Sequence, residues 1–167
     1  MKLIIALLLI ILVFFMVYGK KQHSRMIMHE RDKMHYLKNW GIHQSINWNL
    51  QRIMYFADKM ELLKKYLKEE KINKIVVYGM GVVGKTFVEQ MEKNDIAICY
   101  GIDQAKVNTE IEVRKPEQVE NDIDIILVTA EIYYQEIYQT LKEKVDVPIV
   151  PLSQFLDEVK LTMHMLS

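Results

Sequence analysis

Residues 74–86 read KIVVYGMGVVGKT, and this stretch decides the fold that the sequence predicts. The apolar run Ile75–Tyr78, rich in β-branched residues, indicates a buried strand. Three glycines follow, and a helical pattern then continues from Lys85 to Glu92. Strand, glycine turn and helix in this order predict a phosphate-binding site, because the free amide groups and the dipole at the start of the helix face the anion.

Each glycine of this turn has its own role in the prediction. Gly79 allows a tight turn, Gly81 leaves no Cβ to block a pyrophosphate, and Gly84 lets the helix pack closely on the strand. The site is expected to include the whole turn and the residues that end two later strands. The predicted binding residues are Gly79, Met80, Gly81, Val82, Val83, Gly84, Asp103 and Thr129. For Thr129, a cap at the end of its strand is an equally good interpretation.

The same turn matches two nucleotide-binding motifs. Its glycines give the dinucleotide pattern G-x-G-x-x-G, and residues 79–86 also give the phosphate loop G-x-x-x-x-G-K-T. A dinucleotide fold requires an acid about 20 residues after the glycines to bind ribose hydroxyls. Asp103 follows a second apolar strand and lies nineteen positions after Gly84. The surrounding sequence therefore favours the dinucleotide type of site.

A nucleoside triphosphatase is the less favoured interpretation of this turn. In a phosphate loop, Lys85 would reach the β- and γ-phosphates and Thr86 would hold Mg²⁺. Such an enzyme also requires a Mg²⁺-binding acid at the end of a neighbouring strand. The apolar strand at 124–128 is followed by Thr129 and Ala130, and no acid stands there.

The rest of the domain alternates strands with helices. Strands are expected at 96–102, 125–128 and 147–150, a helical turn after Pro116, and helices at 132–144 and 154–161, the last capped by Ser153. This alternation predicts an α/β fold, a Rossmann-like parallel sheet with helices on both faces. The strand that contains Pro148 is expected at a sheet edge. Cys99 is expected to be a small buried hydrophobe within its strand.

The sequence offers no convincing catalytic group. It has no nucleophile turn and no recognisable pair of acids, and two Y-x-x-x-K matches, at Tyr55 and Tyr138, are interpreted as chance. The five histidines lack metal-ligand spacing, so no metal site is predicted. With 22 basic and 22 acidic residues, the chain also lacks the charge excess of a nucleic-acid-binding protein. Binding is favoured over catalysis, and a minimal NAD(P)-dependent oxidoreductase stays open as the alternative.

Residues 1–20 are expected to form a membrane anchor. Leu3–Gly19 is a run of seventeen residues without a charge, which spans about 25 Å as a helix. A cleaved signal peptide is the alternative, but Val17-Tyr18-Gly19 matches a cleavage site poorly. Basic residues directly after the run, Lys20 and Lys21 among them, place the rest of the chain in the cytoplasm. The localisation predicted is a single-pass membrane protein with a cytoplasmic C-terminal domain.

Residues 21–71 are expected to form a helical connector before a nucleotide-binding domain at 72–167. One helix is expected at 24–40, Gly41 interrupts it, and a longer helix follows from Ser45. An apolar stripe with spacings of three and four runs along that second helix. It consists of Ile46, Leu50, Ile53, Ala57, Met60, Leu63 and Leu67. The stripe packs on the domain, pairs with residues 24–40, or joins two copies as a homodimer through helix 45–70.

Residues 72–156 resemble a small Rossmann-type domain associated with bacterial cell-surface polysaccharide biosynthesis. The resemblance is carried by KIVVYGMGVVGK, YGID, IEV followed by RKPEQV, IILVTA, and VPIVPLSQFL. It implies binding of NAD(P) or a nucleotide-sugar through Gly79, Gly81, Gly84 and Asp103. In larger relatives a similar module accompanies dehydratases or transferases, which implies an accessory or regulatory role beside a partner biosynthetic enzyme.

Overall fold

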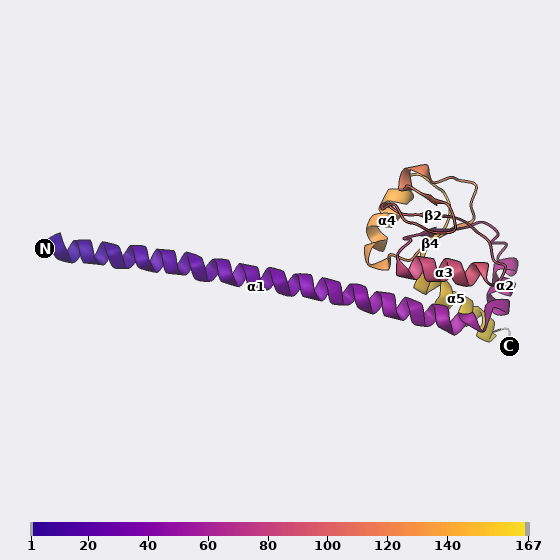
Figure 1. Cartoon of the computed structure of the whole chain (residues 1–167), viewed down its shortest axis with the longest axis horizontal. Coiled ribbons are helices and arrows are strands. Elements are labelled where there is room, and N and C mark those ends of the chain that lie inside the picture. The colour runs from indigo at the N-terminus through magenta and orange to yellow at the C-terminus, as the bar shows by residue number, and fades with distance from the viewer. Residues whose placement is uncertain (1, 166–167) are drawn as a thin grey trace. The chain divides into compact units, whose positions relative to one another are not determined.

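The computed structural model describes the backbone of residues 2–165 and the side chains of residues 18–162. The chain divides into two compact units, residues 1–42 and residues 43–167. Helix α1, Lys2–Ala57, forms all of the described part of the first unit and continues into the second. Figure 1 shows the second unit as strands covered by the remaining helices.

The predicted membrane anchor falls mainly on residues 1–17, whose side chains lie outside the described ones, and it stays a prediction. Across the described part of the chain, the structure contains no helix with the length and apolar character needed to cross a bilayer.

The connector differs from its prediction in where its helix breaks. The expected interruption at Gly41 is wrong, because α1 passes through this residue without a break. A single glycine costs a helix only about 1 kcal/mol, which the flanking helix formers tolerate. The break comes instead at Asp58 and Lys59, and α2, Met60–Glu69, follows. This turn lets Phe56 before it and Met60 after it both reach the domain core.

The second unit contains one five-stranded parallel sheet with the order β3-β2-β1-β4-β5. Its strands are β1 (Ile75–Tyr78), β2 (Ile98–Ile102), β3 (Val113–Arg114), β4 (Ile125–Val128) and β5 (Ile149–Pro151). This order confirms the predicted α/β fold with a parallel sheet, and it is the doubly wound order of dinucleotide-binding folds. The strand with Pro148 before it does lie at an edge, as predicted.

Helices cover both faces of the sheet. The end of α1 packs with α2, α3 (Val82–Glu92) and α5 (Leu152–Met165) against one face, around residues such as Val77 and Leu127. The other face packs against α4 (Tyr134–Leu141) through Ile137 and Leu141. Short 3₁₀ helices precede β4 and α4, at Pro116–Gln118 and Glu131–Tyr133. The described fold therefore has its core divided by the sheet (Figure 1).

Cys99 is exposed, so the expectation of a buried cysteine is wrong. The register explains the difference: Ile75 pairs with Ile98 but Val76 pairs with Tyr100, so Cys99 is an extra residue in β2. Such a bulge takes the residue out of the regular alternation of the strand. Ile98 and Tyr100 on either side of it are both buried, on opposite faces of the sheet.

Asp124 links the start of β4 to the start of β1. Its Oδ2 accepts the backbone amides of Asn73 at 2.6 Å and Lys74 at 2.8 Å. These two bonds hold the pKa of Asp124 below its ordinary value of 3.8, and the bond from Asn73 has the larger effect. Because the folded pKa is lowered, the bonds stabilise the fold above the unfolded pKa, and this stability is lost as pH falls through the folded pKa.

We expect Asp124→Asn to lower the free energy of unfolding by about 1 kcal/mol at pH 7, a value reduced for partial solvent screening. Once the pH falls below the lowered folded pKa of Asp124, the wild type is protonated too, so the difference between the two proteins should vanish. Urea unfolding at a series of pH values measures it. The exposed Asp146→Asn serves as the control and should show no such difference. An Asp124→Asn effect that does not shrink at any acidic pH at which the wild type stays folded would contradict the assigned role.

Candidate functional site

The glycine turn joins β1 to α3 in three residues, of which Gly79 is the first. Its φ of +96° lies in a region that other residues rarely adopt. A Cβ at this position would also lie 2.8 Å from the hydroxyl oxygen of Thr129. The Gly79 amide donates to the Ile102 carbonyl at 2.8 Å, which fixes the turn to the end of β2. Gly79 thus makes the tight turn.

Gly84 is where α3 crosses the end of β1. A Cβ added to it would lie 2.2 Å from the carbonyl oxygen of Gly79 and 3.3 Å from the Thr129 hydroxyl oxygen. No side chain fits at this distance from backbone. Gly84 therefore sets how closely the helix approaches the strand.

At position 81, in contrast, no contact inside the domain requires a glycine. Its φ of −75° and ψ of −157° are open to any residue. An added Cβ would meet no atom within 4 Å. Neither backbone strain nor packing requires a glycine here, whereas a group that approaches the turn from outside would need the space.

The amides at the start of α3 are free within the domain. Gly81 is the residue before the helix, and no side chain caps the helix start. The first bond back to the turn is from the Lys85 amide to the Gly81 carbonyl, at 3.0 Å. Among the described residues, none accepts a hydrogen bond from the amides of residues 81–84. With the helix dipole, these amides can bind an anion.

Asp103 stands beside this turn, at the end of β2. Its Oδ2 accepts the Met80 amide at 2.7 Å, and its Oδ1 accepts the Ala105 amide at 2.8 Å. Each carboxylate oxygen can accept a further bond, so the group can still bind a hydroxyl. The structure therefore brings Asp103 and the glycine turn together, although one turn amide is occupied by the carboxylate.

The side chains of three predicted site residues, Met80, Val82 and Val83, lie in different surroundings. Met80 and Val83 are buried at 1% and 5% exposure, so they can offer a ligand only their backbone. Met80 packs over Gly101, where an added Cβ would lie 2.7 Å from the methionine Cγ. Val82 is 62% exposed and lies at the rim of the turn.

Thr129 hydrogen-bonds to the backbone at the end of β1 and at the start of the glycine turn. Its buried hydroxyl lies 2.5 Å from the Gly79 carbonyl oxygen and 3.2 Å from the Tyr78 carbonyl oxygen, and it has a single proton to donate. Its amide donates to the same Tyr78 carbonyl at 2.9 Å. Of the two interpretations of Thr129, this geometry supports the cap. The residue shapes the turn without facing the ligand space.

A crevice opens beside the turn at the carboxyl ends of β1, β2 and β4, and we call it the switch-point crevice. Its volume is about 300 Å³. Tyr78 and Gly79 from β1 and the turn line it, with Asp103 and Gln104 from the end of β2. Open parallel sheets bind ligands at this place, where the strand order reverses. Burial raises the pKa of Tyr78, opposed in part by a hydrogen bond with Gln104, so the phenol stays protonated at neutral pH.

The wall opposite β2 is formed by the segment after β4. It contributes Tyr133, Glu136, Ile137 and Thr140, which share one face of the helical segment. No residue of this face is among those predicted to bind. The sequence signal for this face is the spacing i, i+3, i+4, i+7 directly after a strand. A helix that follows β4 turns one face toward the switch point, so residues at this spacing could have been predicted to line the site.

Comparison with known proteins gives no match for this chain, whether with family models, curated proteins or solved structures. Its function is therefore to be inferred from the chemistry of the site.

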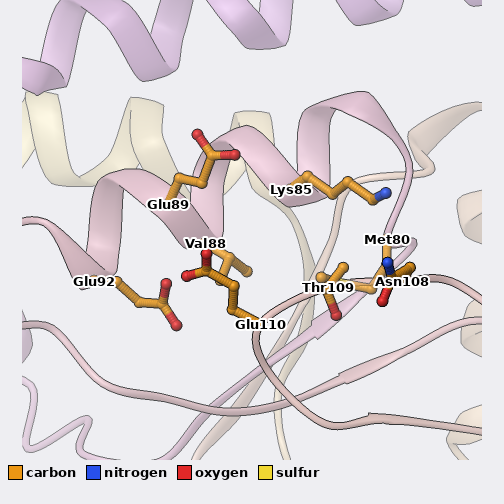
Figure 2. A pocket seen from close by; sticks show the side chains of 8 residues that line it. All are labelled: Met80, Lys85, Val88, Glu89, Glu92, Asn108, Thr109 and Glu110. Carbon is orange, nitrogen blue, oxygen red and sulfur yellow. The ribbon is translucent and has the colours of Figure 1, made fainter.

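Lys85 faces a second cavity of about 400 Å³, between α3 and the loop from β2 to β3. Figure 2 shows Glu92 and Glu110 pointing toward each other at one end of it, while Lys85 lies with Asn108 near the other. No lysine, arginine or histidine is among the residues that line the switch-point crevice. Within the described residues, no three His, Cys, Asp or Glu side chains are arranged to hold a metal.

The phosphate-loop alternative has no support in this geometry. A phosphate loop must wrap around the phosphates before its helix begins. Here α3 already begins at Val82, so Lys85 and Thr86 are helical residues of the first two turns. The three-residue turn before Val82 is of the dinucleotide type.

Proposed function

We propose that this chain is a nucleotide-binding module that holds NAD(P) or a nucleotide-sugar by its diphosphate. The observation that carries the proposal is the start of α3, where the amides of residues 81–84 have no acceptor among the described residues and a Cβ at Gly81 would enter open space. An anion placed there satisfies the amides and uses the room at Gly81.

The position of Asp103 supports a ligand that carries hydroxyls next to its phosphates. Its carboxylate lies at the turn and retains acceptor capacity. In doubly wound folds, an acid at this strand end accepts bonds from ribose hydroxyls. The five-stranded order places turn and acid at the same switch point.

We assign the module no reaction of its own. The described residues at the crevice hold no nucleophile beside a base, and nothing in their arrangement favours the alternative of a minimal oxidoreductase over binding. The resemblance of residues 72–156 to modules of polysaccharide biosynthesis supports an accessory or regulatory role there. A partner biosynthetic enzyme would then carry out the chemistry.

From the sequence alone, we propose that residues 1–20 anchor the chain in the membrane and that the nucleotide-binding unit lies in the cytoplasm. The support is the uncharged run Leu3–Gly19 with Lys20 and Lys21 directly after it. A cytoplasmic unit would have access to cellular nucleotides.

Titration of the full-length chain in mild detergent with NAD⁺, NADH, NADP⁺, UDP-sugars and ATP tests the proposed function. We expect saturable binding of at least one of them, and loss of that binding in Gly81→Val. The valine side chain would occupy the space for the diphosphate, while the fold should persist because the position is open. Thermal unfolding should therefore stay close to that of the wild type.

Lys85→Ala is the matched control, since Lys85 lies on the same helix but lines the second cavity. It should leave the affinity unchanged. Absence of binding for all these nucleotides, or equal binding by wild type and Gly81→Val, would refute the proposed function. Loss of ATP binding in Lys85→Ala alone would instead favour the triphosphatase.

A further inference from the structure

The switch-point crevice has a lining that suits an uncharged ring rich in hydroxyls. Its hydrogen-bonding side chains are the carboxylates of Asp103 and Glu136, the amide of Gln104, the hydroxyl of Thr140 and the phenols of Tyr78 and Tyr133. Both carboxylates line the crevice together with Tyr78, and the charge of each raises the pKa of the Tyr78 phenol. Carboxylates accept hydrogen bonds from hydroxyls, whereas they repel a further phosphate.

The size of the crevice limits what it can hold. About 300 Å³ is the lower end of the range for ligand pockets, which leaves room for one ring. It shares Gly79 with the glycine turn, so a group in it lies next to phosphates held at the start of α3. Tyr133 and Ile137 add apolar surface on which the carbon face of a ring can pack.

The number of acceptors favours a hexose over a ribose. Two vicinal ribose hydroxyls would use the two free acceptor positions of Asp103 alone. The Glu136 carboxylate on the opposite wall would then have no partner in the ligand, while the Thr140 hydroxyl, which already donates to the Glu136 carbonyl at 2.9 Å, could still accept a bond. A pyranose attached through its anomeric oxygen presents further hydroxyls around the ring, and these can reach both walls.

We propose that the switch-point crevice binds the hexose of a nucleoside diphosphate-hexose whose diphosphate lies at the start of α3, with Glu136 as a specificity residue. The inference rests on the proposed function, since it requires the diphosphate at the glycine turn. Asp103 and Glu136 accept the sugar hydroxyls from opposite sides. The nucleoside then extends away from the crevice.

Competition titrations of the full-length chain in mild detergent test this assignment. Each of UDP, GDP and dTDP is compared with its hexose derivatives UDP-glucose, UDP-N-acetylglucosamine, GDP-mannose and dTDP-glucose. We expect at least one hexose derivative to bind about a hundredfold or more tightly than its parent diphosphate, since each of two bonds to charged groups provides about tenfold. Glu136→Gln should reduce that advantage about tenfold and leave the parent diphosphate unaffected.

Glu143→Gln, a carboxylate outside the crevice, is the matched control and should keep the hexose preference. Equal affinities for every hexose derivative and its parent diphosphate would overturn the inference. If Gly81→Val then bound neither the derivative nor the parent, the proposed function would still stand. Equal weakening of parent and derivative by Glu136→Gln would also overturn the inference. No binding of any of these compounds would refute both proposals.

Discussion

Gly84→Ala will be destabilised by about 3 kcal/mol or will fail to fold, the upper range for forcing a methyl group into packed structure. The added Cβ would lie 2.2 Å from the Gly79 carbonyl oxygen and 3.1 Å from its carbon, both of them backbone atoms. Relief requires α3 to move away from β1. The movement would separate α3 from the sheet that its buried residues Phe87 and Met91 contact.

Gly81→Ala is the matched control for this prediction, three positions earlier and directly before α3. Its methyl group meets no atom within 4 Å, so we expect a change of less than about 1 kcal/mol, the ordinary cost of alanine before a helix. Urea unfolding followed by circular dichroism measures both variants. Similar unfolding midpoints for the two would show that helix and strand are not held at the described distance.

The two glycines also show what the sequence could establish about the site. The pattern of three glycines predicts the turn, and the structure places Gly79 and Gly84 where only glycine fits. The pattern alone could not separate these structural glycines from Gly81, whose Cβ position is open. For Gly79 that distinction depends in part on Thr129 and Ala130, which follow β4 about fifty residues later in the sequence. For Gly84 it depends on how closely α3 approaches the backbone of Gly79, which the pattern of glycines does not specify.

The sequence established the order of strands and helices because apolar runs and turn residues are local signals. It gave no access to contacts between distant segments. The turn residues around Asp122 and Asp124 predict that both acids are solvated. Asp122 is indeed exposed and pairs with Lys74 at 2.5 Å, whereas Asp124 accepts two backbone amides at the start of β1. Nothing in their local sequence distinguishes acids that cap a distant strand. The bulge at Cys99 could not be predicted for the same reason. It depends on the register between β1 and β2, which the local sequence of one strand does not specify.

The boundary of the folding unit is a further point that local pattern left open. The apolar stripe of residues 46–67 was compatible with packing on the domain or with pairing of two copies. In the structure most of the stripe joins the hydrophobic core of its own domain, where α2 packs on α5. Residues 43–71 belong to the same compact unit as the sheet.

A fragment of residues 72–167 will therefore not fold, whereas residues 43–167 will. The segment 43–71 contributes six hydrophobic side chains that are at most 6% exposed: Ile53, Phe56, Met60, Leu63, Tyr66 and Leu67. At about 1.5–3 kcal/mol for each buried side chain, their loss equals the whole stability of a typical domain, about 5–15 kcal/mol. Circular dichroism and dispersion of amide proton signals distinguish a folded fragment from an unfolded one.

Two neighbouring leucines in α2 test the same packing in the full-length chain. Leu63 is 0% exposed and Leu62 is 38% exposed, so the same change to alanine removes the same atoms from opposite environments. We expect Leu63→Ala to cost about 3 kcal/mol of unfolding free energy and Leu62→Ala less than about 1 kcal/mol. If both variants unfold like the wild type and the 72–167 fragment folds, α2 does not belong to the core. The sheet would then have to be stable with that face covered by α3 and α5 alone.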